Sequence, residues 1–226
     1  MEVYDKIYEN CNPAPEEIIC KCVEVLIKMN NGRPRRVLEC CCADCYQHIE
    51  WASVMGGPNV PVVPTLSYWD NDIDVVRGEE HLKVVLLREN GRSRRATSTC
   101  CYSTLMVDHS AYSGVMLMLF EEAFRVQEDD PDVPPTKPLP AESRIYLKDF
   151  DTSYGALPEF RGDPARVHQI CCPEYVKAWN SISSPTLDNP SGENIHSLFE
   201  RIPEMILGLE EGKRINNRND CSPEFV

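Results

Sequence analysis

The sequence lacks any long hydrophobic run. Among its 226 residues, the longest apolar segment, residues 114–120, has the length of a strand and not that of a membrane span. The first residues are polar and acidic, and no basic segment leads into an apolar one, so no secretory signal is visible. These absences predict a cytoplasmic protein with no membrane partner.

Basic charge is also scarce. The chain has 23 Lys and Arg against 36 Asp and Glu, a formal net charge of −13, and a surface this negative repels phosphate backbones. The basic residues cluster once, at Arg92, Arg94 and Arg95 beside a turn, where they are typical of a solvated hairpin end. The three tryptophans are isolated from one another, so they form no stacking platform for single strands. We therefore expect no nucleic-acid partner.

Cysteine, by contrast, is abundant. In a reducing compartment, 12 cysteines indicate metal binding or thiol chemistry more than disulfides. Eight of them gather in three groups: Cys20-Lys21-Cys22, residues 40–45 and the pair Cys100-Cys101. Alternate residues of a strand point to one face, so both thiols of a C-x-C motif can reach one metal. Thiolates favour zinc among the divalent ions. Four thiolates complete the coordination of a zinc ion, whereas three leave one coordination position for water or a substrate sulfur.

The remaining pattern is typical of a mainly β domain, because short apolar segments are separated by frequent turns. The expected strands are residues 18–29 and 36–40, joined as a hairpin, 81–88 and 94–101, joined as a second hairpin, 115–120 and 145–147. A short helix is predicted for residues 46–52. Residues 128–140, rich in proline and acid, predict an extended connection, and helical spacing recurs at residues 173–179 and 193–209.

The cysteine order resembles that of the glutathione-dependent formaldehyde-activating family, whose domain is shared by centromere protein V. Residues 40–47, CCCADCYQ, match a family pattern C-x-C-x-D-C followed by a polar residue, and residues 20–25, CKCVEV, resemble its opening C-x-C-G-x-V. Residues 140–146 resemble the closing strand of that domain. The resemblance implies Mss4-like zinc-binding β-sheets over residues 16–155, preceded by an irregular lead-in (1–15) and followed by a helical C-terminal extension (156–226).

The resemblance also implies one or two zinc ions per chain. A structural zinc would use Cys20, Cys22 and Cys101. Where the family has C-x-x-C-G, this chain has Ser98-Thr99-Cys100-Cys101-Tyr102, and serine is a poor zinc ligand. That site then holds three thiolates, recruits Cys100 or stays empty. Val23 replaces the glycine that follows the first motif, which predicts a different turn there.

A second zinc would use Cys40, Cys42 and Cys45, which the family links to glutathione and to carbon–sulfur chemistry. A thiol that approaches an open zinc position loses its proton and becomes a nucleophile toward an aldehyde; the reverse step releases both. Cys41 alternates with the ligands and is expected to point into the core. The remaining cysteines lack metal spacing.

Four further side chains have more than one interpretation. Asp44 orients a ligand, takes a proton, or stabilises a helix N-terminus. His48, three residues after Cys45, serves as an acid or base, is an extra metal ligand, or is a half-buried histidine without a role. His109 either approaches a pocket or lies in a plain loop. Arg95, like its neighbour Arg94, either holds substrate carboxylates or belongs to the solvated hairpin.

The leading hypothesis is a carbon–sulfur lyase that acts on a thiol–aldehyde adduct resembling S-hydroxymethylglutathione. One alternative is a tailoring lyase or isomerase of a biosynthetic pathway on the same fold. Another is a non-catalytic, zinc-stabilised module that recruits a protein partner. The sequence does not predict an oligomeric state.

Overall fold

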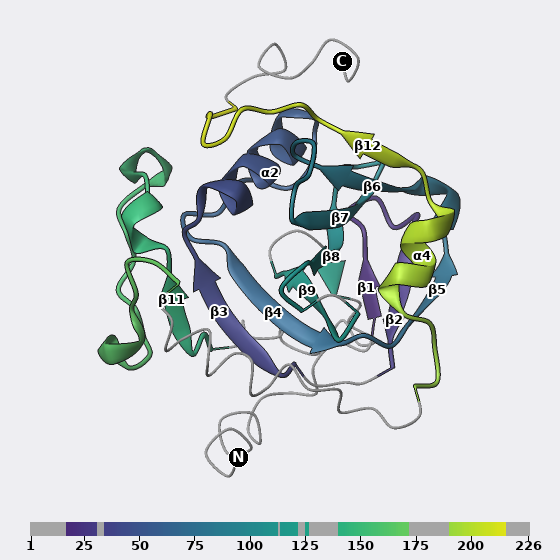
Figure 1. Ribbon diagram of the computed structural model, residues 1–226, viewed down its shortest axis with the longest axis horizontal. Helices are drawn as coiled ribbons and strands as arrows, with labels where there is room; N and C mark the ends of the chain where they lie inside the picture. The colour runs from purple at the N-terminus through teal and green to yellow at the C-terminus, as the bar shows by residue number, and fades with distance from the viewer. Residues whose placement is uncertain are drawn as a thin grey trace.

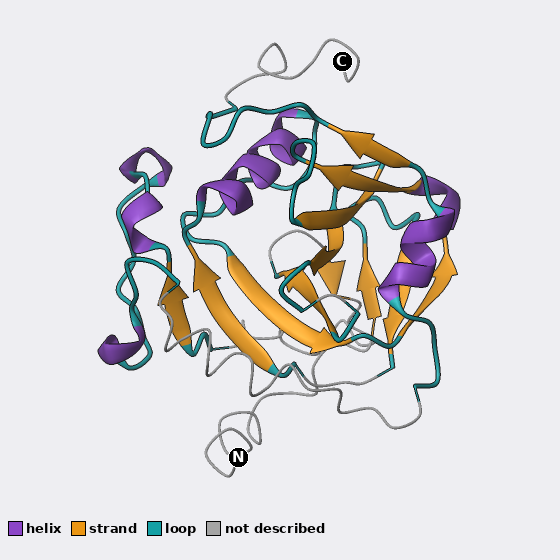
Figure 2. Cartoon of the chain, in the orientation of Figure 1, coloured by secondary structure: helices purple, strands orange, loops and turns teal. Residues whose placement is uncertain are grey.

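The computed structural model describes residues 17–30, 34–112, 114–121, 140–171 and 190–215, together with the backbone of residues 125–126. These residues form two β-sheets and two α-helices, so the predicted mainly β class is confirmed (Figure 1, Figure 2). The predicted lead-in (1–15), most of the connection 128–140 and the predicted helix 173–179 lie outside the described residues. Neither α-helix among these residues has the length and apolar character needed to cross a membrane.

The smaller sheet has the order β10-β1-β2-β5 and is antiparallel throughout. Its strands are β1 (Glu17–Ile19), β2 (Leu26–Met29), β5 (Ile73–Arg77) and β10 (Arg125–Val126). The predicted single strand 18–29 is therefore wrong, because a turn around the first C-x-C motif divides it in two. The predicted hairpin with residues 36–40 is also wrong, because β2 pairs with β1 and with the distant β5 instead.

The larger sheet has eight strands in the order β11-β3-β4-β9-β8-β7-β6-β12. They are β3 (Arg36–Cys40), β4 (Thr65–Asp70), β6 (Leu82–Leu86), β7 (Ser93–Ser98), β8 (Thr104–His109), β9 (Met116–Phe120), β11 (Ser143–Ile145) and β12 (Glu204–Ile206). The predicted strand 36–40, the β6–β7 hairpin and the fully buried β9 are confirmed. The last predicted strand begins two residues earlier than expected, at Ser143.

Helix α2 (Ala43–Val54) confirms the predicted helix 46–52 and extends it at both ends. It follows β3 directly, with Cys42 as its N-cap residue. Its middle and C-terminal part bury Trp51 and Ala52 in an apolar cluster with Val85 of β6. The helix therefore covers part of one face of the larger sheet.

Helix α4 (Ile195–Arg201) is shorter than the predicted helix 193–209. Pro203 has no N–H to continue the helix, so the chain becomes extended and forms β12, which pairs in parallel with β6. Ile195, Leu198 and Phe199 of α4 are buried in the cluster that also contains residues of the smaller sheet. The C-terminal segment thus adds one helix and one edge strand to the β-sheets.

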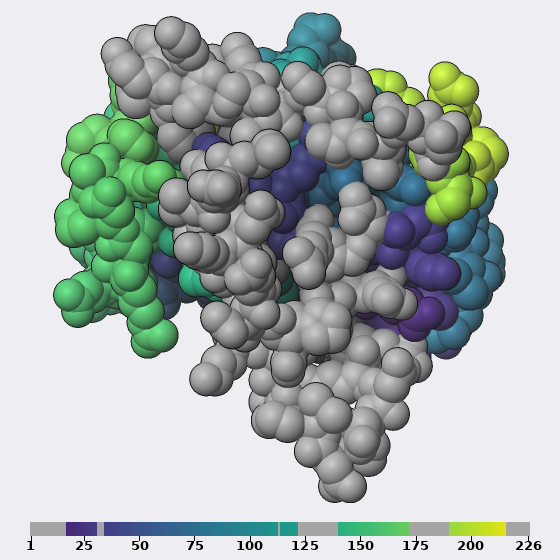
Figure 3. All heavy atoms as spheres, turned by 90° about the horizontal axis from the view of Figure 1, so that it is seen from below, coloured from purple at the N-terminus to yellow at the C-terminus, as the bar shows by residue number. Residues whose placement is uncertain are grey.

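Short 3₁₀-helices occupy the connections, namely η1 (Glu79–His81), η2 (Leu147–Asp149), η3 (Thr152–Tyr154) and η4 (Pro164–Arg166). Residues 140–171 and helix α4 lie at opposite sides of the molecule (Figure 1, Figure 3), whereas the end of the C-terminal segment returns toward residues 151–154, where Arg214 pairs with Asp151. Residues 140–171 flank β3 through β11, and residues 190–215 flank β6 through β12. The larger sheet is thus extended at both edges by segments that follow it in sequence.

Candidate metal centres

Four cysteine sulfurs converge between two turns of the chain. The Sγ atoms of Cys20, Cys22, Cys100 and Cys101 all lie within 4.8 Å of one another. The Cys20–Cys22, Cys20–Cys100 and Cys22–Cys100 separations are 3.5, 3.8 and 3.0 Å. Four sulfurs bound to one zinc at about 2.3 Å lie about 3.8 Å apart. The donor set and its spacing therefore fit a closed four-thiolate zinc site. We call these four cysteines the four-sulfur group.

The two turns are built in the same way and are bonded to each other. In the first, the Cys20 N–H donates to the Val25 carbonyl at 3.1 Å; in the second, the Ser98 N–H donates to the Ser103 carbonyl at 2.9 Å. The Lys21 N–H donates to Ser103 Oγ at 3.0 Å and joins the turns. The sulfurs converge because both turns face each other, and not through strand alternation as predicted.

Cys100 lies with the other three sulfurs, whereas Ser98 has a different partner. Ser98 Oγ accepts the Ser103 N–H at 3.0 Å and lies 3.3 Å from the Cys101 sulfur. Burial by itself raises the pKa of Cys101, but hydrogen bonds from Ser103 and Ser98 outweigh it and lower this pKa to about 6. Ser98 therefore supports the turn and a neighbouring thiolate, and the geometry offers Cys100 as the fourth sulfur.

Three further sulfurs gather where β3 passes into α2. The Sγ atoms of Cys40, Cys42 and Cys45 lie within 4.8 Å of one another, and the Cys40–Cys45 pair is 3.7 Å apart. Cys40 ends β3, and Cys42 caps α2 by accepting the Cys45 N–H at 3.4 Å. The partial positive charge of a helix N-terminus stabilises a thiolate placed there. We call these residues the three-sulfur cluster; its donor set fits a zinc with one open position.

Charge within the three-sulfur cluster is concentrated on Cys42. Hydrogen bonds from Cys40 and then Cys45 lower the pKa of Cys42 well below its ordinary value. The hydrogen bond to Cys42 raises the pKa of Cys40, and burial adds to that rise. Cys42 is half-buried, whereas Cys40 and Cys45 are 3% and 7% exposed. The most acidic sulfur is thus the most accessible one.

Cys41 points away from its two ligand-type neighbours, as predicted. It is fully buried in a separate apolar cluster with Tyr46 and Val63, whereas Cys40 belongs to the cluster around Leu38 and Phe120. Burial raises the pKa of Cys41 to about 11. It is an inert core thiol that separates the two outer cysteines.

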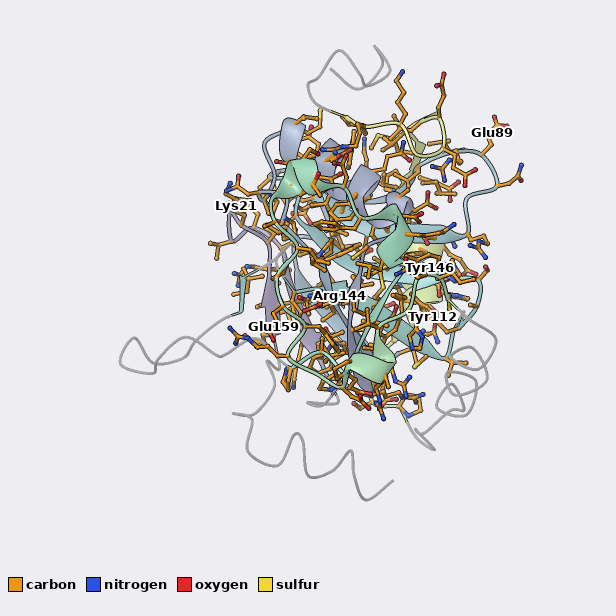
Figure 4. All side chains as sticks on the ribbon, turned by 90° about the vertical axis from the view of Figure 1, so that its left-hand side faces the viewer. Lys21, Glu89, Tyr112, Arg144, Tyr146 and Glu159 are labelled. Atoms are coloured by element: carbon orange, nitrogen blue, oxygen red, sulfur yellow. The ribbon has the colours of Figure 1, made fainter. Side chains whose placement is uncertain are left out.

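The environment of the three-sulfur cluster includes residues that the sequence pattern did not identify. Tyr112 is buried in the same apolar cluster, and the partly buried Tyr146 and Cys171 pack against it. Burial raises the pKa of Tyr146 to about 12. Figure 4 shows Tyr112 and Tyr146 near each other and Lys21, the residue between Cys20 and Cys22, on the opposite side. These residues are distant from the cysteines in sequence, so they could be identified only from the way residues 112 and 146 pack near β3 in the folded chain.

The predicted acid or base, His48, is fully buried in α2. Its Nε2 lies 2.6 Å from Thr104 Oγ1, and its ring packs against Trp51 and Phe120. Burial lowers its pKa well below the ordinary value, so the ring is neutral. His109 is half-buried, and its Nδ1 accepts the Ala111 N–H at 2.9 Å. The polar contact of His48 is therefore with Thr104, and its catalytic role stays a prediction.

Asp44, Arg94 and Arg95 lie in three different surroundings in the structure. Asp44 lies in the first turn of α2 and forms an ion pair with Arg88 at 2.9 Å, while Cys42 supplies the helix cap. Arg94 faces the C-terminal segment, where it pairs with Glu204 at 3.3 Å. Arg95 is 3% exposed, so it is not part of a solvated hairpin end.

A small apolar pocket opens beside α2 and next to Thr104, the partner of His48. Its lining residues are Ile49, Ala52, Pro58, Asn59, Pro61, Tyr102, Thr104 and Phe120. Ile49 and Phe120 also pack in the cluster that contains Cys40 and Cys45. The pocket thus adjoins the apolar surroundings of the three-sulfur cluster.

Comparisons with known proteins do not identify a family for this chain. No family model and no curated protein matches the chain. A crystal structure of a Rhodobacter sphaeroides protein from a structural genomics programme aligns with 16% identity over 53% of this chain and 91% of that one, at a TM-score of 0.33. A likeness this distant carries no argument about activity. The two cysteine groups, which could hold metal ions, are the firmest functional evidence.

Proposed function

We propose that the chain is a zinc-dependent carbon–sulfur lyase-type enzyme, resembling the glutathione-dependent formaldehyde-activating family, that acts on a thiol–aldehyde adduct. The observation that carries the proposal is the unequal size of the two cysteine groups, four sulfurs in one and three in the other. Four thiolates complete the coordination of zinc, whereas three leave a position for a ligand. The first group would then be structural and the second catalytic.

The surroundings of the three-sulfur cluster suit this role. A zinc held by Cys40, Cys42 and Cys45 would supply a Lewis acid that takes up a substrate sulfur as its thiolate. The α2 N-terminus and the buried Arg95 both favour negative charge near Cys42. These groups would stabilise the thiolate that the reaction releases.

The proposed reaction is balanced without any redox partner. In an S-hydroxymethyl adduct the carbon–sulfur bond breaks, and the sulfur keeps the bonding electron pair. The hydroxyl proton leaves to a base, and the carbon becomes the aldehyde. His48 is the base predicted from sequence; the half-buried His109 is the second imidazole near Arg95. The reverse reaction joins a thiol and an aldehyde. Glutathione is the candidate thiol.

Metal content and thiol binding test the proposal together. Protein purified without chelator is expected to hold two zinc ions per chain, one of which responds to added glutathione. Cys42→Ser should lower the content to one, abolish turnover of S-hydroxymethylglutathione and retain the far-ultraviolet circular dichroism of the wild type. Cys41→Ala, a change at the adjacent core thiol, should keep both metals and the activity.

Each alternative has a distinct outcome. Two zinc ions that are indifferent to thiols would favour a non-catalytic module, which the burial of Cys40 and Cys45 would also suit. Thiol binding without turnover of the glutathione adduct would favour a tailoring lyase or isomerase with another substrate. Unfolding of Cys42→Ser would remove the main support for catalysis at this site.

A further inference from the structure

Arg95 lies on the face of the larger sheet that carries the three-sulfur cluster. In β7 it is directly opposite Val107 of β8, which is opposite Met118 of β9. Side chains at paired positions project from the same face of a sheet. Val107 and Met118 belong to the apolar cluster that contains Cys40 and Cys45. Arg95 is therefore a cation built into the apolar surroundings of these sulfurs.

The guanidinium of Arg95 is buried and largely unpaired. It has five N–H donors; Nη1 donates to the Ser93 carbonyl at 3.2 Å, and Nε has no hydrogen-bond partner. No carboxylate or sulfur in the described part of the chain accepts a hydrogen bond from it. The buried Arg144, by contrast, pairs with Glu39 at 2.5 Å. A buried charge without a partner is destabilising, which indicates that Arg95 has a use other than stability.

The groups that face Arg95 show what that use is. The acidic side chains that act on Arg95 are, in order, Cys45, Asp44, Cys42 and Tyr112; of the two thiols, Cys42 has the lowered pKa. Asp44 already has Arg88 as its partner. Thiolate sulfurs are large and weak acceptors, whereas a carboxylate accepts two parallel N–H bonds from one guanidinium. The free donors thus match an oxyanion that enters beside the sulfurs.

We propose that Arg95 binds a carboxylate of the substrate and selects thiols that carry this group. The inference rests on the proposed function, because it takes the substrate sulfur to lie at the open position of the three-sulfur cluster. It narrows the substrate class to anionic thiols and their aldehyde adducts. Because the chain has a net charge of −13, its surface repels anions in general, and the buried Arg95 would supply the local attraction for such a thiol.

A pair of small thiols tests the inference by binding alone. Cobalt-substituted protein is titrated with 3-mercaptopropionate, which is anionic, and with 2-mercaptoethanol, which is neutral and of similar size; thiolate-to-cobalt absorption reports both. The wild type is expected to bind the anionic thiol about 10-fold more tightly, which is about 1.4 kcal/mol. Arg95→Met should remove this preference, because it should weaken the binding of 3-mercaptopropionate about 10-fold more than that of 2-mercaptoethanol.

Two further variants complete the test. Arg94→Met changes the neighbour that faces Glu204 on the other side, so it should keep the full preference. Arg95→Lys keeps the charge without the planar fork, so it should keep part of the preference and reports on Arg95 even if the Met variant does not fold.

The contrary outcomes are separable. Equal affinities in the wild type, or equal weakening of both thiols by Arg95→Met, would overturn the inference and leave Arg95 as a counter-charge for the cysteine thiolates. A wild type that binds two cobalt ions but neither thiol would overturn the proposed function itself. A reversed preference, for the neutral thiol, would also exclude carboxylate binding by Arg95.

Discussion

Val23 and Tyr102 have the same left-handed backbone conformation, and each directly follows a cysteine of the four-sulfur group. Their φ angles are 73° and 52°. This region costs a non-glycine residue about 1–2 kcal/mol, so the turns keep their shape against the preference of their residues. Val23 thus adopts a positive φ of the kind that favours glycine, and the difference from the family's turn stays a prediction.

Val23→Gly is expected to stabilise the protein. Glycine adopts positive φ without a steric penalty, and a β-branched residue is the least suited to it. The Val23 side chain is 47% exposed, so its removal sacrifices little packing. We expect a gain of about 1 kcal/mol in the free energy of unfolding, measured in urea on the zinc-loaded protein.

Val23→Ala is the matched control for this prediction. Alanine keeps the Cβ atom that causes most of the strain, so its gain should be smaller than that of glycine. The expected order of stability is Gly, then Ala, then Val. A Val23→Gly variant less stable than the wild type would show that the valine side chain, and not the strained backbone, determines stability at this turn.

The fourth ligand of the four-sulfur group can be assigned by two substitutions. Cys100→Ser should lower the zinc content by one ion per chain and cost several kcal/mol, because structural zinc contributes directly to folding. Ser98→Ala removes only the hydrogen bonds to Ser103 and Cys101, so zinc content should be unchanged. Zinc content and urea unfolding measure both. Loss of zinc in Ser98→Ala alone would reverse the assignment.

Elements with strong local signals could be predicted from the sequence. The β6–β7 hairpin surrounds Asn90-Gly91, and Asn90 has the positive φ, 58°, that such turns require. The turn at Val23 could not be predicted, since valine there gives no turn signal. The pairing of β2 with β5 is non-local, so residue alternation does not encode it. Pro203 marked a break, but not the strand that follows it.

The candidate site likewise has a part that the sequence pattern predicts and a part that depends on non-local contacts. Both cysteine groups follow from spacing, because each C-x-C places its sulfurs within reach of one metal whether a turn or a helix cap holds them. The proximity of Cys100 to Cys20 depends on two turns that are 80 residues apart. Arg95 faces Cys42 and Cys45 only because β7 is the neighbour of β8 and α2 covers that face. Its burial required the three-dimensional fold.

Acid stability is expected to depend on His48. Burial, together with the charge of Arg95, lowers its pKa well below the ordinary value. The unfolded chain therefore binds a proton near pH 6.5 that the folded chain does not, and stability falls as the pH drops below about 6.5. Above that pH the effect is absent. The slope contributed by this one group is at most about 1.4 kcal/mol per pH unit.

His48→Gln isolates this contribution, because glutamine does not titrate and can still bond to Thr104. The difference between wild type and variant in unfolding free energy should change between pH 6.5 and 5 and be constant above pH 7. Parallel curves for wild type and His48→Gln would contradict the prediction.

A buried carboxylate joins α2 to the C-terminal segment. Glu50 is 3% exposed, accepts the Ile215 N–H at 2.8 Å, and is bonded to both Arg214 and Tyr154. Removing the arginine leaves a buried negative charge without its cation. Arg214→Met should therefore lower the free energy of unfolding in urea by about 3 kcal/mol.

The double variant Glu50→Gln with Arg214→Met distinguishes charge from packing. If the uncompensated carboxylate causes the loss, neutralising Glu50 should recover about half of it, since the amide can still accept the Ile215 N–H. Arg201→Met is the control: its ion pairs with Glu79 and Glu193 are exposed, so it should cost less than about 1 kcal/mol. A double variant no more stable than Arg214→Met would mean that Arg214 acts through packing on Tyr154, whose ring lies 4.0 Å from its guanidinium.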